Sequence, residues 1–393
     1  MKFYMEEEKQ TRELKIKRNI TISISIISIL SLITLILLYI FNIQFRNIVD
    51  INILRKNIST DEVPTIDLDA NKSNQICVYS KYIAILNDKK ISLYNNYGDF
   101  VSDFSVDINN AIFASANKYL AIAEYGGKNF YVFLDNTYLW SGVIEGEIKQ
   151  IYVNANGYVA IVTTDVTYKS IITLYDQEGK SIIKKYLSST RVIDVGISKD
   201  NKYLAIAELD TSGTLIQSNI DIISVENTIN NVDKSVVYSY NADKGKLITK
   251  IKYQDKNRLV CMYDDEIQVI NENYQIEYPF KKHNNTTYMS VNLNSNFVYI
   301  EEEIKGLFKA NSVIHICNNQ GGSVNTYNLE EVAKDIYSAD NVIAVNVGLE
   351  TYFINNNGWL IKKVSSNQEI TNICFSGGLA GIVYKDKIDI IDF

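Results

Sequence analysis

The chain is 393 residues long, 46% hydrophobic and 22% charged, so it can bury a large core and falls outside the composition typical of disordered proteins. Tyrosine is abundant (28 residues) and proline is rare (two), and β-branched and aromatic residues dominate between Asn, Asp, Gly and Lys turns, which favours β-sheet. The formal charge of −7 is uneven: residues 1–41 carry six basic and four acidic side chains, and the rest of the chain carries 33 and 42, a net −9 that disfavours nucleic-acid binding.

The first predicted element is a membrane-spanning helix at residues 19–41. These 23 residues carry no charge and are rich in Ile and Leu, and a helix of that length spans a hydrocarbon core of roughly 30 Å at about 1.5 Å per residue. A cleaved secretory signal has a shorter apolar stretch followed by small residues, yet no alanine occurs between Phe41 and Ala70. We therefore expect an uncleaved anchor.

The distribution of basic residues around this segment predicts its direction. Four precede it closely and three follow at wider spacing: Arg12, Lys15, Lys17 and Arg18 before, and Arg46, Arg55 and Lys56 after. The positive-inside rule then places residues 1–18 in the cytoplasm as a tail and the rest of the chain outside. Residues 42–63, which show no regular apolar period, are predicted to be a juxtamembrane stalk, and residues 64–393 an extracytoplasmic domain.

A repeat runs through the predicted domain. The octamer Asn-Lys-Tyr-Leu-Ala-Ile-Ala-Glu occurs at residues 117–124 and again at 201–208, an offset of twice 42 residues. Looser copies bring the number of units to eight, at spacings of 37 to 55 residues; they begin at Tyr82, Tyr119, Tyr158, Tyr203, Arg258, Phe297, Val342 and Leu379. A period near 40 with short apolar strands indicates an all-β fold, a β-propeller of four-stranded blades. Eight blades are expected, or seven if the weak unit at 246–285 is misread.

One unit can be divided into strands directly. Residues 111–115, 119–125, 129–134 and 138–144 are apolar stretches separated by turn residues, so each unit supplies four strands. The last unit ends at Phe393 after three strands, which would leave an unpaired edge. We therefore expect residues 65–69 to close the ring as the missing fourth strand.

The segment at residues 197–207, Ile-Ser-Lys-Asp-Asn-Lys-Tyr-Leu-Ala-Ile-Ala, resembles the blade motif of WD40-like and TolB-like propellers, with Asn201 where those motifs usually have glycine. From tail to last blade, the chain is similar to an uncharacterised family of clostridial single-pass, membrane-anchored propellers, a domain of unknown function. That resemblance implies the layout and no known reaction, since one architecture hosts many functions.

The residues that usually carry chemistry are scattered. His283 and His315 suggest no catalytic set, and the cysteines lie too far apart in sequence for a zinc motif, so we expect no catalytic residue, metal or cofactor. The cysteines are Cys77, Cys261, Cys317 and Cys374. Cys77 and Cys374 become neighbours if the ring closes, either as a disulfide or as buried free thiols. The acidic runs at 264–266 and 301–303 are interpreted as a solvated turn and a solvated strand end.

Two long units point to a binding surface. Their extra residues fall between the second and third strands, at 210–218 and 303–312, on one face of the ring. Leu215, Ile216, Leu307 and Phe308 are apolar residues where a loop should be polar, and Tyr168 occupies the corresponding loop of another unit. These five residues are the predicted partner-binding site.

The sequence thus predicts a non-enzymatic binding scaffold or receptor at the outer face of the cell membrane, with a protein or an envelope polymer as partner. The alternative is an extracytoplasmic propeller enzyme acting on glycans, which would need two carboxyl groups about 5 to 10 Å apart in a cleft. The oligomeric state stays open.

Overall fold

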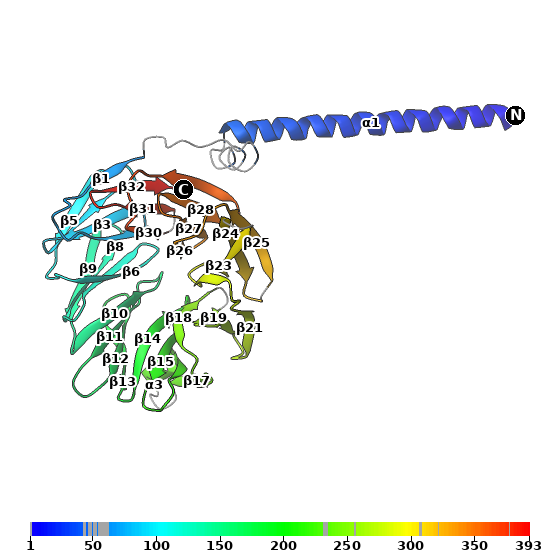
Figure 1. Cartoon of the computed structure of the whole chain (residues 1–393). Coiled ribbons are helices and arrows are strands. Elements are labelled where there is room, and N and C mark those ends of the chain that lie inside the picture. Colours follow the sequence, from blue (N-terminus) through cyan, green and yellow to red (C-terminus); the bar gives the residue numbers. More distant parts are fainter. Residues whose placement is uncertain are drawn as a thin grey trace. The chain divides into compact units, whose positions relative to one another are not determined.

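The computed structural model describes residues 2–41, 45, 49, 53, 63–230, 235–254, 257–305, 309–320, 322–376 and 378–393. The N-terminal helix and the β domain belong to separate units (Figure 1). Helix α1 (Lys2–Phe41) contains the stretch Asn19–Phe41, whose mean hydropathy of 2.7 and 23 residues make it long and apolar enough to cross a membrane. Its hydroxyls bond within the helix: Ser25 Oγ donates to the carbonyl of Thr21 and Thr34 Oγ1 to that of Leu30, both at 2.9 Å.

The β domain is a ring of eight four-stranded antiparallel sheets, the blades of a propeller (Figure 1). The first four blades are β2 (Gln75–Tyr79), β3 (Tyr82–Asn87), β4 (Lys90–Tyr94), β5 (Phe100–Ser105); β6 (Ala111–Ala116), β7 (Tyr119–Glu124), β8 (Asn129–Leu134), β9 (Thr137–Val143); β10 (Glu147–Val153), β11 (Val159–Thr164), β12 (Ser170–Tyr175), β13 (Ser181–Leu187); and β14 (Thr190–Ile197), β15 (Tyr203–Asp210), β16 (Gln217–Ser224), β17 (Val236–Asn241), with helix α3 (Val225–Asn230) between the last two. The other four are β18 (Ile248–Tyr253), β19 (Leu259–Tyr263), β20 (Glu266–Ile270), β21 (Ile276–Lys281); β22 (Thr286–Ser290), β23 (Asn296–Lys305), β24 (Lys309–Asn318), β25 (Ser323–Leu329); β26 (Asp335–Ala339), β27 (Val342–Asn346), β28 (Glu350–Asn355), β29 (Leu360–Ser365); and β30 (Asn372–Ser376), β31 (Leu379–Val383), β32 (Lys387–Asp392) with β1 (Thr65–Asp67).

The ring closes as the sequence predicts. Strand β1 pairs with β32 as the outer strand of the eighth blade, with Thr65 opposite Asp389, Ile66 opposite Ile388 and Asp67 opposite Lys387. Ile66 is buried there, so its side chain joins the core while the backbone of β1 covers the edge that β32 would expose. The expectation of eight blades is confirmed, and the weak unit at 246–285 is a complete blade.

The second strand of each blade is buried on both faces because a neighbouring blade covers each one. In β7, Leu120 and Ile122 belong to the hydrophobic cluster shared with the first blade. Ala121 and Ala123, on the other face of the same strand, belong to the cluster shared with the third blade. Alternate residues therefore bind the blade to its two neighbours, which explains why this strand reads as an unbroken apolar run.

The connections define two faces of the ring. The loop face carries the connections between second and third strands and the connections between blades; the turn face carries the hairpins from first to second and from third to fourth strand. Within the domain, the chain begins on the turn face: the carbonyl of Pro64 accepts a hydrogen bond from the amide of Ile390 at 2.8 Å, and the carbonyl of Thr65 lies against Gly98 in a hairpin of the first blade.

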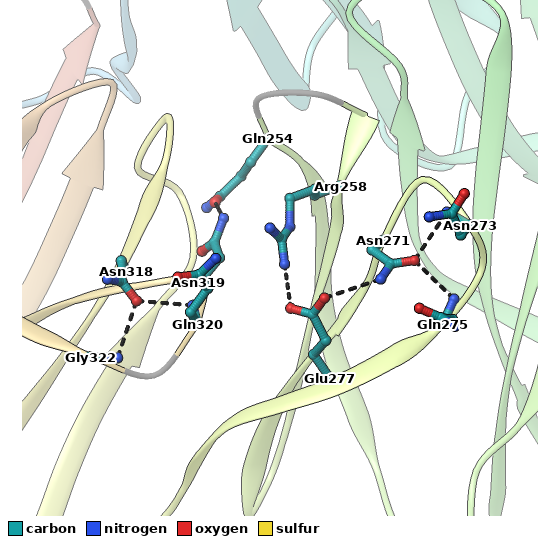
Figure 2. Close-up of polar contacts among 10 residues, drawn as sticks. All are labelled: Gln254, Arg258, Asn271, Asn273, Gln275, Glu277, Asn318, Asn319, Gln320 and Gly322. Carbon is teal, nitrogen blue, oxygen red and sulfur yellow. Dashed lines mark hydrogen bonds and ion pairs between the residues drawn. The ribbon is translucent and has the colours of Figure 1, made fainter.

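One turn geometry recurs on the turn face, where an Asn or Asp side chain accepts two backbone amides of its own hairpin. Figure 2 shows two examples: Asn271 Oδ1 accepts from the amides of Asn273 and Gln275, and Asn318 Oδ1 from those of Gln320 and Gly322, at 2.9 to 3.1 Å. The same arrangement occurs at Asn95, Asn154, Asp176 and Asn355. The third residue after the Asn or Asp often has positive φ, a conformation that glycine or asparagine tolerates; Asn201, which replaces the usual glycine of the blade motif, has φ 61°.

A buried polar link on this face joins the fifth blade to the sixth. Gln254, which is fully buried, donates to the carbonyls of Val291, Leu293 and Asn296 at 2.9 to 3.1 Å. Its Oε1 accepts from Asn319 Nδ2 at 2.5 Å (Figure 2). One side chain thus satisfies several buried groups that apolar packing would leave unpaired.

Candidate functional site

The loop at residues 211–216 leaves apolar side chains on the surface of the loop face. Asp210 Oδ1 accepts the amide of Ser212 at 2.8 Å, and the carbonyl of Ile216 accepts the amide of Gly245 at 2.9 Å, from the connection to the next blade. The backbone is therefore tied down at both ends. Leu215 nevertheless is 58% exposed and Ile216 36% exposed.

Tyr168 lies in the corresponding loop of the third blade but is packed rather than projecting. Asp165 Oδ1 accepts the amides of Thr167 and Tyr168, and the ring of Tyr168 lies 4.8 Å from the ring of Tyr186. The residue that projects from this loop is Val166, which is fully exposed. The sequence analysis did not single out Val166, although its place between turn residues is the same signal that identified Leu215.

Leu307 and Phe308 lie outside the described residues, and their role stays a prediction. The expected loop at 303–312 is wrong in its bounds, because β23 continues to Lys305 and β24 begins at Lys309, with Lys305 opposite Lys309 in the ladder. The extra residues of this unit lengthen a hairpin, since continued pairing satisfies backbone groups that a loop would leave to water. Ile304, near the end of β23, is 80% exposed.

Further exposed apolar residues of the loop face include Tyr125 and Leu349, each between the second and third strands of its blade. With Val166, Leu215, Ile216 and Ile304, they form the group we call the apolar rim. It draws on the second, third, fourth, sixth and seventh blades. On the turn face, Tyr97 and Trp359 are exposed on hairpins between third and fourth strands.

Both histidines of the chain meet at one carboxylate on the sixth blade, which the sequence analysis missed. His283 Nδ1 lies 2.5 Å from Glu301 Oε1, and His315 Nε2 lies 3.4 Å from Glu301 Oε2. The ring of Tyr299 stacks on that of His315 at 4.6 Å. Burial lowers the pKa of His315, opposed by the charges of Glu301 and Glu303. The only sequence feature that could have revealed this contact is the register of β23 and β24, in which Tyr299 is paired with His315 and Glu301 lies two residues further along β23.

The interpretation of the two acidic runs as solvated is wrong for two of their members. The side chain of Glu301 is 14% exposed because the histidines cover it. Glu266 begins β20 instead of ending a turn, is buried, and forms an ion pair with Lys246 at 2.5 Å. Among the described residues, no group of three or more His, Cys, Asp or Glu side chains is arranged to hold a metal ion.

The four cysteines are free thiols. Cys77 and Cys374 do lie on neighbouring inner strands, β2 and β30, where Cys374 Sγ donates to the carbonyl of Ile76 at 3.5 Å. Burial raises the pKa of Cys77 to about 12 and that of Cys374 to about 11. Of the two expected alternatives, the structure has the free thiols, and each is half-buried rather than buried.

The central channel, bounded by the inner strands, holds a cavity of about 1070 Å³. It extends to the turn face, because its lining includes residues of the hairpins between first and second strands in several blades, among them Asn117, Asn154, Lys199 and Asp340. The charged residues of the lining are Lys118, Lys149, Lys199, Lys250, Lys252, Asp194 and Asp340.

These features define an eight-bladed β-propeller that carries an N-terminal apolar helix and has an apolar rim on one face. The chain belongs to the family of unknown function DUF5711, which matches residues 54–393, so the expected membership of an uncharacterised propeller family is confirmed. No curated protein matches the sequence.

Solved structures share the architecture. BamB from Moraxella catarrhalis is 12% identical, with 85% of this chain and 99% of that chain covered and a TM-score of 0.53. The β-propeller domain of Cps50 (Swd1) from Myceliophteria thermophila is 11% identical, with 84% and 99% covered and a TM-score of 0.48. At such low identity the likeness to BamB shows the fold alone.

Proposed function

We propose that the protein is a membrane-anchored, extracytoplasmic binding scaffold without catalytic activity, whose partner is a protein that docks on the apolar rim. The observation that carries the proposal is the exposure of Val166, Leu215, Ile216 and Ile304 on a face whose loops are held in place by backbone bonds. Ordered, exposed apolar side chains gain free energy only when another apolar surface covers them, which favours a protein over a polar polymer.

The position of the chain's attachment supports this use of the loop face. Residues 63 and 64 join the ring on the turn face, so the tether does not begin among the loops of the apolar rim. The apolar stretch Asn19–Phe41 supports anchoring in a membrane, and the denser basic residues before it support a cytoplasmic tail.

The docking surface can be tested with a photoreactive amino acid placed in the full-length protein in intact cells. Position 166 or 215 on the loop face should yield a discrete protein adduct on illumination. Position 97, whose side chain is also well exposed but on the turn face, is the control and should yield none. The same adduct from position 97, or no adduct from either loop-face position, would contradict the proposal.

The topology has its own test. A protease added to intact, wall-stripped cells should digest the propeller and spare residues 1–18, because the anchor keeps the tail inside. Detergent-permeabilised cells are the control for access to the tail. Protection of the propeller in intact cells would overturn the proposed orientation.

A further inference from the structure

The chain contains two Asn-Gly pairs, Asn156-Gly157 and Asn357-Gly358. Both lie in hairpins of the turn face, the first between β10 and β11 and the second between β28 and β29. In such a pair the backbone nitrogen of the glycine can attack the asparagine side chain with little hindrance, because glycine has no side chain of its own. The two pairs are therefore candidate sites of spontaneous deamidation that can be compared within one fold.

The backbone around the two pairs is closely similar. Each glycine amide donates to the carbonyl three residues earlier, Gly157 to Asn154 at 3.0 Å and Gly358 to Asn355 at 2.9 Å. Both glycines have positive φ, at 82° and 72°. The side chains of Asn154 and Asn355 each accept two amides of their own turn. The turn therefore restrains the attacking nitrogen in the same way at both pairs.

The side chains of the two asparagines are held differently, although both residues are exposed. Asn156 Nδ2 donates to the carbonyl of Lys199 at 2.8 Å and to Asn201 Oδ1 at 3.1 Å, both in a hairpin of the fourth blade. These two bonds tie the nitrogen that must leave, and they oppose rotation of the side chain. At Asn357 only the backbone amide is hydrogen-bonded within the described part of the chain, so the side chain can rotate.

We propose that Asn357 is a site of spontaneous deamidation in the folded protein and that Asn156 is protected from the same reaction. The backbone nitrogen of Gly358 loses its proton to solvent and attacks Cγ of Asn357. A C–N bond forms, the Cγ–Nδ2 bond breaks, and Nδ2 leaves as ammonia. Water then opens the resulting succinimide at either carbonyl, which gives aspartate or isoaspartate.

The reaction would change the turn face in two ways. Either product places a new carboxylate two residues before Trp359, which is exposed. Isoaspartate also adds a methylene to the backbone of a turn in which Asn355 Oδ1 accepts the amides of Asn357 and Trp359, at 2.9 and 3.1 Å. We therefore expect the isoaspartate form to melt below the aspartate form, because only isoaspartate disturbs these bonds.

The test is incubation of the full-length protein in detergent at mildly alkaline pH, with peptide mapping by mass spectrometry at successive times. Fragment ions separate Asn357 from Asn355 and Asn356. A sample unfolded in urea gives the intrinsic rate at each pair. We expect similar rates at the two pairs in the unfolded chain, and in the folded protein a rate at Asn357 at least about tenfold higher than at Asn156, because two hydrogen bonds oppose the reaction there. Asn357→Gln is the control, because its longer side chain cannot close the same ring.

A second variant tests the cause of the protection. Asn201→Gly removes one of the two bonds to Asn156, and glycine tolerates the positive φ of this position, 61°. It should raise the rate at Asn156 about fivefold and leave the rate at Asn357 unchanged.

Four results would overturn the proposal. They are equal rates at the two pairs in the folded protein, faster conversion of Asn156, no conversion of Asn357 while the unfolded chain converts, or an unchanged rate at Asn156 in Asn201→Gly. If that variant melts early, the comparison of the two pairs in the wild type alone decides.

Discussion

The two faces of the ring are built on different principles. On the turn face, Asn95, Asp176, Asn271, Asn318 and Asn355 repeat one side-chain-to-backbone turn in five blades. The loop face has connections of different lengths, and exposed apolar residues such as Val166 and Leu215 that no contact within the fold requires. The turn face therefore contributes to stability, whereas the exposed apolar residues of the loop face are available for binding. Removing the side-chain-to-backbone hydrogen bonds of the turn face should lower stability, and replacing exposed apolar residues of the loop face should not.

The largest effect on stability is expected from Gln254→Ala on the turn face. The substitution would leave three carbonyls and Asn319 Nδ2 without their buried partner, and such groups cost about 1 to 3 kcal/mol each when unpaired. We expect a loss of at least about 3 kcal/mol and a clearly lower melting temperature. Asn273→Ala is the control, because this exposed residue contributes only its backbone amide (Figure 2). Equal melting of both variants would contradict the structural role of the link.

A smaller loss is expected from Asn318→Ala. Its Oδ1 holds the amides of Gln320 and Gly322, so the substitution removes two bonds from one hairpin, about 1 kcal/mol in all since water can replace them in part. Gln320→Ala, at an exposed position of the same hairpin, should change the melting temperature little. If Asn318→Ala melted like the wild type, the repeated turn would not be needed for stability.

The next prediction concerns the histidine cluster of the sixth blade and the pH dependence of stability. Burial lowers the pKa of His315, so in the window below its ordinary value of 6.5 the unfolded chain takes up a proton that the folded chain resists. Stability from this group is therefore present near pH 7.5 and is lost as the pH falls through 6.5, by at most about 1.4 kcal/mol per pH unit. His315→Gln should reduce the difference in melting temperature between pH 7.5 and 5.5. An unchanged difference would assign the pH dependence to other groups.

The fold could be predicted from the sequence because the length of the repeated unit can be measured directly along the chain. The octamer at residues 117–124 and 201–208 set the spacing, and seven of eight complete units predicted the closing strand at Thr65. Each predicted start of a unit lies within one residue of the first residue of a second strand; Arg258, for example, immediately precedes β19 (Leu259–Tyr263).

The candidate sites were less accessible to sequence because they depend on which residues face one another. Glu301 contacts His283, which lies in the connection between two blades, and His315, which lies on the next strand. The spacing of these three residues in the sequence does not reveal that they meet. The five lysines that line the channel likewise come from two hairpins and two strands in different blades, with Lys250 and Lys252 both on β18. Leu215 was found from its place in a long loop, whereas the packing of Tyr168 on Tyr186 is a tertiary contact.

The most direct test of the contrast between the faces compares matched pairs of exposed apolar residues. Leu215→Ser/Ile216→Ser alters the loop face and Tyr97→Ser/Trp359→Ser the turn face, in the full-length protein. Each should change stability by less than about 0.5 kcal/mol per residue, since all four side chains are exposed. Large apolar side chains gain about 1.5 to 3 kcal/mol each on burial, so the loop-face pair should reduce crosslinking from a photoreactive residue at position 166 by about a hundredfold. The turn-face pair should leave the crosslinking unchanged. Undiminished crosslinking by the loop-face pair, or a large fall in its melting temperature, would contradict the account.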